Sequence, residues 1–452
     1  MGRDVRASRL ADLGAATGSL GVAGARTRGD HVPASSAVAL AGRSAPPGAR
    51  LDCAAGQRAP LDSPDASDCS AVRRGRRMVV ALGAMGTLLL LGVGLVMSLM
   101  LPVRAWRTGE PPAPPLALAP GRPLTTSPTR VWIDTDAACG HSPRTDPDDC
   151  LAILLLAQAQ DVTIAGVSTV FGNAPLTVTD STTRALVAAL HAADLQSPAV
   201  YRGSPAPSAP RDVAAPSAAL PAHDRLQRAL QEAPLVIVAL GPMTNVAAAL
   251  RDRPELRARV RRVVAVMGRR PGHLFHPVEG GTARSFLGHG PVFRDFNVAK
   301  DADAVAEVLA MQLPTTFVPY EAARDVAIHD GVLRGMSARG GAAAWVAKRA
   351  GAWLEYWREE IGREGFYPFD VVAAAFVLRP TLLRCADVTA AVRKDSGILG
   401  WLGTRGLFVG PTAPPAATPY LRAPAQYCPD VAAGADEWLS AQFTARSAPV
   451  PR

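Results

Sequence analysis

Short apolar runs alternate with stretches of helical periodicity from about residue 130 onward. The runs that predict strands are residues 130–134, 162–169, 235–240, 263–267 and 315–318. The helical patterns cover residues 149–160, 177–193, 244–251 and 302–311. This alternation predicts an α/β fold with a mostly parallel sheet flanked by helices, whose ligand site lies outside the carboxyl ends of the strands. Two later runs, residues 387–393 and 407–409, predict a hairpin, and we expect the Pro-rich chain beyond them to be loop.

A longer apolar stretch precedes this region. Residues 78–103 contain no charged side chain, and arginines lie just before them at positions 73, 74, 76 and 77. Because about 20 apolar residues cross a bilayer, the stretch predicts a transmembrane helix that acts as a signal anchor. The flanking arginines predict a cytoplasmic N-terminus and an extracytoplasmic domain, as in a single-pass membrane protein. The alternatives are a cleaved signal sequence, which gives a secreted or periplasmic protein, and a buried core helix.

The other segments differ in composition. Residues 1–77 lack sustained apolar periodicity and aromatic side chains, which predicts a disordered cytoplasmic region. Residues 104–128 are Pro-rich and predict an extended linker, followed by a globular domain over residues 129–443 and a disordered tail over residues 444–452. The 48 basic and 39 acidic residues give a formal net charge of +9. Much of that excess lies in Arg-rich stretches outside the acidic site, so it does not predict nucleic-acid binding.

Aspartates gather at the end of the first predicted strand. Asp134 and Asp136 follow the apolar run, and Asp146, Asp148 and Asp149 come just before the first predicted helix. Carboxylates buried together repel one another unless a cation or a hydrogen-bonded substrate neutralises them. Oxygen ligands of this kind suit a hard cation such as calcium or magnesium. One such aspartate alone is explained as a helix cap, but the whole group indicates a site.

Four later segments carry polar residues at the ends of predicted strands or before an apolar helix. They are Gly172-Asn173, GPMTN at residues 241–245, DFN at residues 295–297, and Phe369-Asp370. Taken singly, each is explained as a turn, a cap or a surface residue. Together with the aspartate cluster, and in this order, they resemble the inosine-uridine preferring nucleoside hydrolase family over roughly residues 131–380.

The resemblance implies a nucleoside hydrolase fold with a Rossmann-like sheet, and a calcium-dependent enzyme that splits ribonucleosides into ribose and free base. The implied calcium ligands are Asp136, Asp149, Asp370 and the carbonyl of Thr244. Asp136 is also implied as the general base, which takes a proton from the water held by calcium. The side chains implied to hold the ribose are Asp148, Asn173, Asp295, Asn297 and His289. The expected partner is a small-molecule nucleoside, and we expect a homo-oligomer.

The sequence departs from the family pattern at several positions. Residues 137–147 form a loop of eleven residues where the family has a short turn, so Asp146 competes with Asp148 as a site residue. Asp295 replaces a glutamate, and His289 stands roughly where an asparagine often contacts the sugar. Phe369 replaces the histidine that in many members donates a proton to the leaving base.

Other side chains are candidates for activating the leaving group. Trp353 and Trp357 lie four residues apart on a helix-like stretch, so both face the same side and are candidates for stacking on the base. A tryptophan stripe that packs against the core is the alternative. His273 and His276 are further candidate proton donors from a loop.

The cysteines after the apolar stretch fit an oxidising compartment. A bond between Cys139 and Cys150 would staple the long loop, and one between Cys385 and Cys428 would tie down the C-terminal segment, but the sequence leaves the pairing open. Two other functions remain open. A phosphohydrolase of the haloacid dehalogenase type also opens with a strand ending in DxD, but it predicts a lysine and a distant acidic pair. A catalytically impaired family member that binds nucleosides is favoured by Phe369.

Overall fold

The computed structural model describes residues 86–92, 115–124, 128–208, 221–270, 295–394, 403–410 and 423–445. The chain divides into two units, residues 1–88 and 89–452, and the sheet belongs to the second. Among the described residues, no helix is both long and apolar enough to cross a membrane. Residues 86–92 are helical with exposed side chains, and the rest of the predicted anchor lies outside the described residues, as do residues 1–77.

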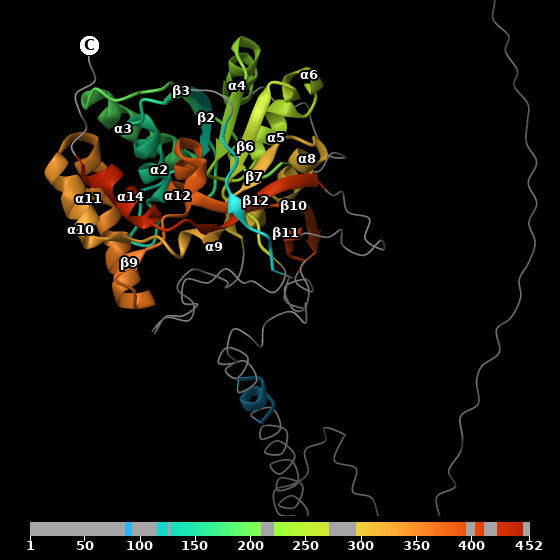
Figure 1. Ribbon diagram of the computed structural model, residues 1–452. Coiled ribbons are helices and arrows are strands. Elements are labelled where there is room, and N and C mark those ends of the chain that lie inside the picture. The colour runs from blue at the N-terminus through green and yellow to red at the C-terminus, as the bar shows by residue number, and fades with distance from the viewer. Residues whose placement is uncertain are drawn as a thin grey trace, which may run out of the picture. The chain divides into compact units, whose positions relative to one another are not determined.

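A ten-stranded sheet forms the centre of the second unit (Figure 1). Its strands are β1 (Ala119–Pro120), β2 (Thr129–Thr135), β3 (Val162–Thr169), β4 (Val200–Arg202), β5 (Leu235–Ala239), β6 (Val260–Ala265), β7 (Thr315–Phe317), β10 (Leu383–Lys394), β11 (Arg405–Gly410) and β12 (Ala423–Val431). Their order is β1-β10-β12-β7-β6-β5-β2-β3-β4, with β11 paired to β10. Neighbours from β12 to β4 are parallel, whereas β10 runs antiparallel to β1, β11 and β12. A separate pair joins β8 (Ile328–His329) to β9 (Gly365–Phe366).

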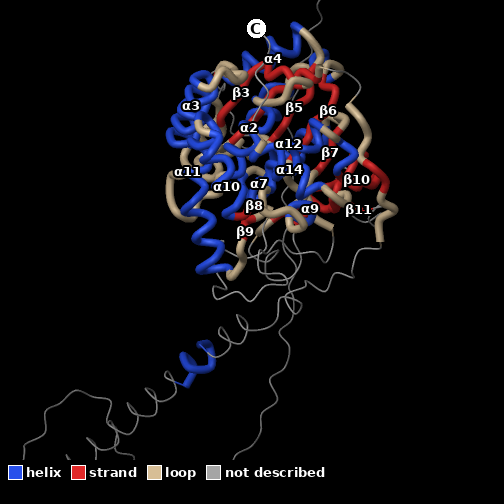
Figure 2. The backbone as a smooth tube through the Cα atoms, turned by 60° about the vertical axis from the view of Figure 1, so that its left-hand side comes forward, coloured by secondary structure: helices blue, strands red, loops and turns tan. Residues whose placement is uncertain are grey.

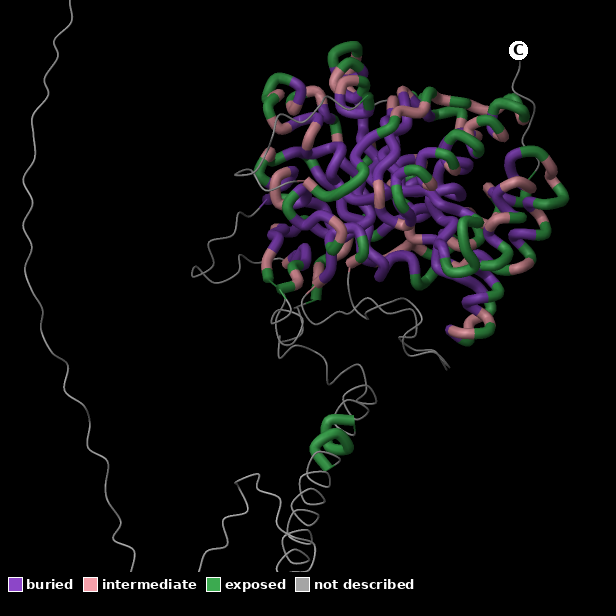
Figure 3. Tube along the Cα trace, turned by 180° about the vertical axis from the view of Figure 1, so that it is seen from behind, coloured by how far each residue is buried: buried purple, intermediate pink, exposed green. Residues whose placement is uncertain are grey.

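Helices cover both faces of the sheet, because successive side chains of each strand point to opposite faces. Val131 and Ile133 belong to one apolar core and Trp132 to the other. The first core is covered by α2 (Asp148–Ala157), α3 (Leu176–Ala192), α9 (Tyr320–Ala323), α10 (Asp330–Arg339), α11 (Gly341–Tyr356), α12 (Phe369–Leu378) and α14 (Ala435–Thr444). The second is covered by α4 (Pro221–Glu232), α5 (Thr244–Leu250), α6 (Pro254–Arg257) and α8 (Ala302–Ala310). Figure 2 shows the strands between these helices, and Figure 3 shows that buried positions follow the sheet.

Shorter elements complete the domain. The helix α7 (Phe296–Lys300) precedes α8, a π-helical turn (Trp357–Ile361) follows α11, and a 3-10 turn (Pro380–Leu382) follows α12. The five strands and four helices predicted along the parallel part of the sheet are present, with ends that differ by a few residues. The predicted hairpin is also confirmed, because β10 and β11 pair antiparallel.

The C-terminal segment differs from the prediction. Residues 423–431 were expected to be loop, but they form β12 between β10 and β7, and α14 follows. Pro424 and Pro429 argue against an interior strand, since proline donates no hydrogen bond to the ladder. Tyr427 and Cys428 are fully buried there, so burial outweighs the proline signal. Part of the predicted linker is also in the sheet, because β1 pairs with β10.

Candidate active site

The course of the chain through the sheet reverses at β2. The chain runs from β2 through β3 to β4 at one edge, whereas β5 lies on the other side of β2 and leads to β6 and β7. In open α/β sheets, ligands bind at such a switch point, outside the carboxyl ends of the strands. Asp134 and Thr135 end β2, and Asp136 follows. The sheet therefore delivers three polar side chains to the position where ligands bind.

Helices α2 and α12 add further carboxylates at this position. Asp148 and Asp149 lie in the first turn of α2, and Asp370 lies in the first turn of α12, which packs beside α2. One oxygen from each of the three lies within 4.8 Å of the others. The amides of Asp149 and Asp370 each donate to an Asp148 oxygen, both at 3.1 Å. The two helix N-termini thus hold three acids, where their partial positive charge favours anions.

Asp136 is joined to these acids through Asp149 and Asn173. Its amide donates to Asp149 Oδ1 at 3.2 Å. The Asn173 amide donates to Asp136 Oδ2 at 2.8 Å, and the Asn173 side chain donates to Asp149 Oδ2 at 3.1 Å. The Thr135 hydroxyl also donates to Asp149 Oδ1. We call Asp136, Asp148, Asp149 and Asp370 the carboxylate cluster.

Glycines of two motifs leave room for the Asp136 carboxylate. A Cβ atom on Gly172 would lie 1.7 Å from Asp136 Oδ2, and one on Gly241 would lie 3.0 Å from Asp136 Oδ1. The first separation is a clash with an atom that is itself held by Asn173. The glycines that open the GN and GPMTN motifs therefore set where this carboxylate can lie.

Gly172→Ala is expected to lower the rate of any reaction that uses Asp136 by about 100-fold, because displacing a positioned group by about 1 Å has effects of that size. Gly351→Ala is the matched control, since a Cβ atom there meets nothing within 4 Å in α11. Alanine is a better helix former than glycine, so the control should keep full activity and gain slightly in stability. Steady-state kinetics and melting temperatures of both variants test this prediction. Equal rates in the two variants would contradict the role of Gly172.

The four side chains of the carboxylate cluster are almost fully buried, and their negative charges repel one another. Asp136, Asp148, Asp149 and Asp370 expose 1%, 3%, 0% and 4% of their surface. Burial raises the pKa of all four, and repulsion from their neighbours raises the pKa of Asp136, Asp148 and Asp370 further. The pKa of Asp148 reaches about 7. Such a set of oxygens fits a hard divalent cation, which would relieve the repulsion.

Asp134 lies near the end of β2 and is held by hydrogen bonds from side chains outside the carboxylate cluster. Its Oδ1 accepts hydrogen bonds from Ser168 Oγ at 2.5 Å and from Asn245 Nδ2 at 2.8 Å. Its Oδ2 is buried and has no hydrogen-bond partner in the part of the chain that the structure describes, and burial raises the pKa of the Asp134 carboxyl to about 7. Asn245 also donates to the Thr169 carbonyl at 3.0 Å, which links the ends of β2 and β3 to α5. Asp134 and Asn245 thus support the strands that carry the site.

Without a cation, the protein is expected to lose stability as pH rises from about 4 to about 7. The folded state raises the pKa of Asp134 and Asp148 from 3.8 to about 7, so it binds more protons than the unfolded state in this window. Stability is then fully present below pH 3.8 and is lost as pH rises through about 7, by about 1.4 kcal/mol per pH unit for each group. Urea unfolding in chelator between pH 5 and pH 8 measures the slope. Asp148→Asn should flatten it, and a rising midpoint in the wild type would contradict this.

Thr244 and the DFN segment are placed as follows. Thr244 begins α5, and its hydroxyl donates to Asp301 Oδ2 at 2.7 Å. Asp295 caps α7 by accepting from the Val298 amide at 3.1 Å, and its other oxygen accepts from the Gly268 amide. Asn297 donates to the carbonyl of Leu240 at 2.5 Å and to that of Val266 at 3.0 Å. Those two bonds tie together the ends of β5 and β6. The other predicted residues here, His289, His273 and His276, lie outside the described residues.

The predicted tryptophans are buried in this structure. Trp353 and Trp357 expose 1% and 0% of their surface and belong to the core that contains α2 and α12. Their rings lie 6.2 Å apart, and Trp357 meets Tyr367 edge-on at 4.8 Å. Tyr367 in turn lies 6.3 Å from Phe369, which is half-buried at the start of α12. This series of edge-on ring contacts therefore ends on the residue beside Asp370.

The long loop is closed by a disulfide bond. Both candidate pairs, Cys139–Cys150 and Cys385–Cys428, are formed. Within the loop, Asp146 accepts a hydrogen bond from the Asp148 amide at 3.2 Å and is itself buried. Asp146 thus supports the first turn of α2.

Sequence reasoning missed two supporting residues. The Thr135 hydroxyl contacts Asp149, and Asp301 receives the Thr244 hydroxyl. Thr135 stands between Asp134 and Asp136 at the carboxyl end of a strand, and that position was the available signal. For Asp301 the sequence carries no comparable signal, because its contact to Thr244 spans 57 residues.

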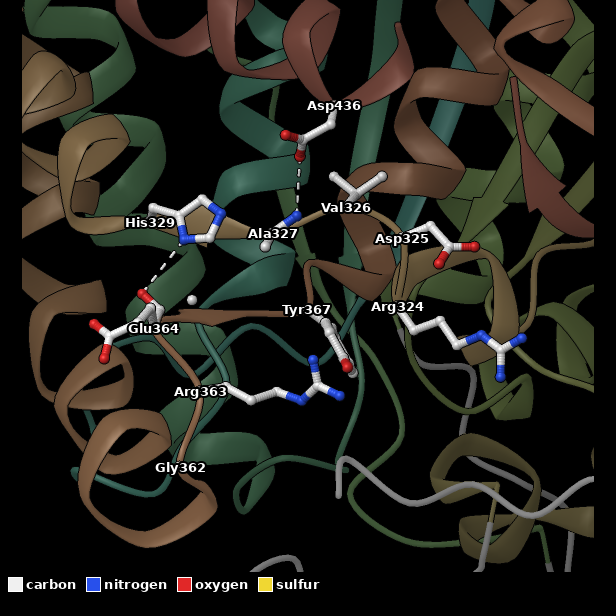
Figure 4. A pocket seen from close by; sticks show the side chains of 11 residues that line it. Arg324, Asp325, Val326, Ala327, His329, Gly362, Arg363, Glu364, Tyr367 and Asp436 are labelled. Atoms are coloured by element: carbon white, nitrogen blue, oxygen red, sulfur yellow. Dashed lines mark hydrogen bonds between the residues drawn. The ribbon is translucent and has the colours of Figure 1, made fainter. Parts of the chain in front are cut away.

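A separate cavity of about 490 Å³ lies beside the two-stranded sheet (Figure 4). Its lining comes from the segments around α9, β8, β9 and α14, and none of the carboxylate cluster is part of it. The Ala327 amide donates to Asp436 Oδ1 at 3.0 Å across its rim. Arg324 and Arg363 share the lining with Asp325, Glu364 and Asp436, and these charges of both signs select no ligand class.

Comparisons with known proteins bear on the fold and the family. The model of the inosine-uridine preferring nucleoside hydrolase family matches residues 131–422. The chain is 26% identical over 287 residues to the non-specific ribonucleoside hydrolase RihC of Escherichia fergusonii, covering 58% of this chain and 83% of that protein. It shares its fold with a plant nucleoside hydrolase at 19% identity and a TM-score of 0.52, covering 71% of this chain and 100% of the other. It also shares it with a purine-preferring ribonucleoside hydrolase from Gardnerella vaginalis at 17% identity and a TM-score of 0.54, covering 71% and 99%.

The family match begins in β2 and ends just before β12. It therefore contains the whole carboxylate cluster, together with the GN, GPMTN, DFN and FD segments. The chain belongs to the inosine-uridine preferring nucleoside hydrolase family, and it is accordingly a hydrolase of the N-glycosidase class.

Proposed function

We propose that this protein is a calcium-dependent nucleoside N-ribohydrolase, which cleaves the N-glycosidic bond of a ribonucleoside to give ribose and free base. The observation that carries the proposal is the carboxylate cluster, buried at the switch point of a sheet whose sequence matches the family.

The cation would be held by the carboxylates of Asp136, Asp149 and Asp370 and by the carbonyl of Thr244. These donors are all oxygen, and the buried carboxylates gain from a positive charge between them. A divalent cation bound there would polarise a water molecule and lower its pKa.

Asp136 would accept the proton of the attacking water. Its Oδ2 is held by the Asn173 amide, so a carboxylate oxygen is kept in place to take the proton of a water at the cation. Gly172 and Gly241 supply the space that this carboxylate occupies, since a Cβ atom at either position would meet it. The geometry thus keeps the basic oxygen at the carboxyl end of β2.

The ribose would be held by the side chains of Asp148, Asn173, Asp295, Asn297 and His289. Asp148 already accepts two backbone amides, and a carboxylate has further lone pairs for sugar hydroxyls. Holding the hydroxyls orients the sugar and favours its flattening toward an oxocarbenium-like transition state.

Many family members have a histidine that protonates the leaving base, and this chain has Phe369 at that position. Phe369 is half-buried beside Asp370 and is the last ring in a series of edge-on aromatic contacts that begins at Trp353. A phenyl ring donates no proton, so solvent or another group would have to protonate the base. This observation favours a second candidate function, in which the protein binds nucleosides and turns them over slowly or not at all.

Binding and turnover measured on one sample separate the two functions. The full-length protein is titrated with inosine and with uridine by calorimetry, and the same samples are assayed for ribose. An enzyme releases many moles of ribose per mole of protein. A binding protein shows heat of binding and at most a trace of ribose. Neither heat nor ribose with any ribonucleoside would contradict both functions.

We also propose that residues 78–103 anchor the protein in a membrane, with the hydrolase domain on the extracytoplasmic side. The two disulfide bonds support this side, because disulfides persist in oxidising compartments. Protease added to intact cells should remove the domain from the cell surface. Full protection from protease, lost only on lysis, would place the domain in the cytoplasm and contradict the proposal.

A further inference from the structure

The Cys139–Cys150 disulfide joins two segments that carry members of the carboxylate cluster. Cys150 directly follows Asp149 in the first turn of α2, and Cys139 comes three residues after Asp136. The side chains of Cys139 and Cys150 are buried in the apolar core and expose 3% and 0% of their surface, respectively. The bond therefore joins the chain that leaves β2 to the first turn of α2, close in sequence to Asp136 and Asp149.

The loop at residues 137–147 is buried at its two ends, residues 137–139 and 145–147, and exposed between them at residues 140–144. The backbone bonds of the exposed part are local, from His141 to Ala138 and from Thr145 to Ser142. The contacts of Arg144 with other elements are a 3.3 Å ion pair with Glu360, which is exposed, and a position over the Tyr356 ring at 5.3 Å. Exposed ion pairs stabilise little. The exposed part is therefore held weakly by these contacts, and the disulfide is the covalent link between the two buried ends.

The carboxylates at the two ends of the loop favour separation when no cation is present. Oxygens of Asp148, Asp149 and Asp370 lie within 4.8 Å of one another, and the Asp136 amide bonds to Asp149 Oδ1, so these buried carboxylates are close enough for their charges to repel. A loop free to open would relieve this repulsion by moving α2 away from β2. A covalent bond across the loop removes that freedom and holds the oxygens ready for a ligand.

We propose that the Cys139–Cys150 disulfide is a positioning element of the cation site, so that tight binding of the cation requires this bond. The inference rests on the proposed function, because it takes the carboxylate cluster as the site of a divalent cation. Loss of the bond should weaken calcium binding without removing any ligand. Outer groups that orient ligands commonly change metal affinity by about 10-fold to 100-fold.

The test compares two double variants of the full-length protein. Cys139→Ser/Cys150→Ser removes the bond at the loop, and Cys385→Ser/Cys428→Ser removes the bond between β10 and β12 as a matched control. Calcium titration is followed by calorimetry, and nucleoside cleavage is followed as a function of calcium concentration. If serine prevents folding of the first variant, Cys139→Ala/Cys150→Val fills the same buried space with apolar atoms.

The first variant is expected to bind calcium at least about tenfold more weakly and to regain wild-type kcat when calcium is raised to saturation. The control should melt at a lower temperature in chelator and keep the wild-type calcium affinity. A purely structural role would lower the melting temperature of both variants and change neither affinity, which would overturn the proposal. A wild-type protein that binds no calcium would overturn the proposed cation site together with this inference, and so the two failures are distinguishable.

Discussion

Replacing Asp136 with asparagine is expected to lower kcat for nucleoside cleavage by about 1,000-fold, while KM changes little. Asparagine keeps the shape of the side chain and can still accept the Asn173 amide bond at the Oδ2 position. It cannot take a proton from water, so the proton acceptor is removed while the surroundings are kept. A loss confined to kcat is the signature of an interaction that acts only in the transition state.

Asp134→Asn is the matched control for this prediction, because it makes the same change two residues away in the same motif. Among the described residues Asp134 Oδ2 has no hydrogen-bond partner, and burial raises the Asp134 pKa to about 7, so we expect a neutral side chain to be tolerated there. The control should keep kcat within about tenfold of the wild type. Steady-state kinetics at saturating calcium measure both variants. An Asp136→Asn protein as active as the control would contradict the role of Asp136 as general base.

Asp370→Asn is expected to abolish the stabilisation of the protein by calcium. A cation at 100 times its dissociation constant adds about 2.7 kcal/mol to the free energy of unfolding, which corresponds to about 5 °C in melting temperature for a domain of this size. Asp370 is one of three carboxylates whose oxygens lie within 4.8 Å of one another, so its loss removes a third of that group. Thermal unfolding with calcium and with chelator measures the effect.

The same variant has a second signature that distinguishes a metal ligand from an ordinary structural aspartate. Burial, together with repulsion from Asp148, Asp149 and Asp136, raises the pKa of Asp370, so a neutral residue there should make the cation-free protein more stable than the wild type. Asp180→Asn serves as the control, because Asp180 is buried but paired with Arg184 at 3.0 Å on α3. That control should lose stability and keep its response to calcium. A full calcium response in Asp370→Asn would exclude Asp370 as a ligand.

Local sequence patterns located β2, β3, β5, β6 and β7 in the parallel part of the sheet, but not β4 or β12. The runs at residues 162–169 and 235–240 are apolar and bounded by polar residues, and β3 and β5 form there almost residue for residue. The prediction failed at β12, whose prolines resemble those of a loop. That strand forms because it lies between β10 and β7, and this long-range pairing is invisible in any short window.

The site shows the same division between local and long-range information. Asp136 lies at one end of the loop at residues 137–147 and Asp148 and Asp149 lie at the other, so their proximity was evident from the sequence. Asp370 joins them across 222 residues, and only the order of motifs in the family resemblance suggested it. The burial of Trp353 and Trp357 was not predictable, because their spacing on a helix fits a core stripe as well as a stacking surface.

Family membership also narrows the competing functions. The haloacid dehalogenase reading shared only the DxD strand, whereas the family match extends from residue 131 to residue 422. The remaining competitor is a nucleoside-binding member without useful turnover, for which Phe369 is the observation in favour.

The most direct measurement is release of reducing sugar by the full-length protein from a panel of purine and pyrimidine ribonucleosides, with calcium and with chelator. The proposed function predicts release from at least one nucleoside, its loss in chelator, its return on adding calcium, and its loss in Asp136→Asn. No release from any nucleoside by a folded protein that calcium stabilises would contradict the assignment as an enzyme.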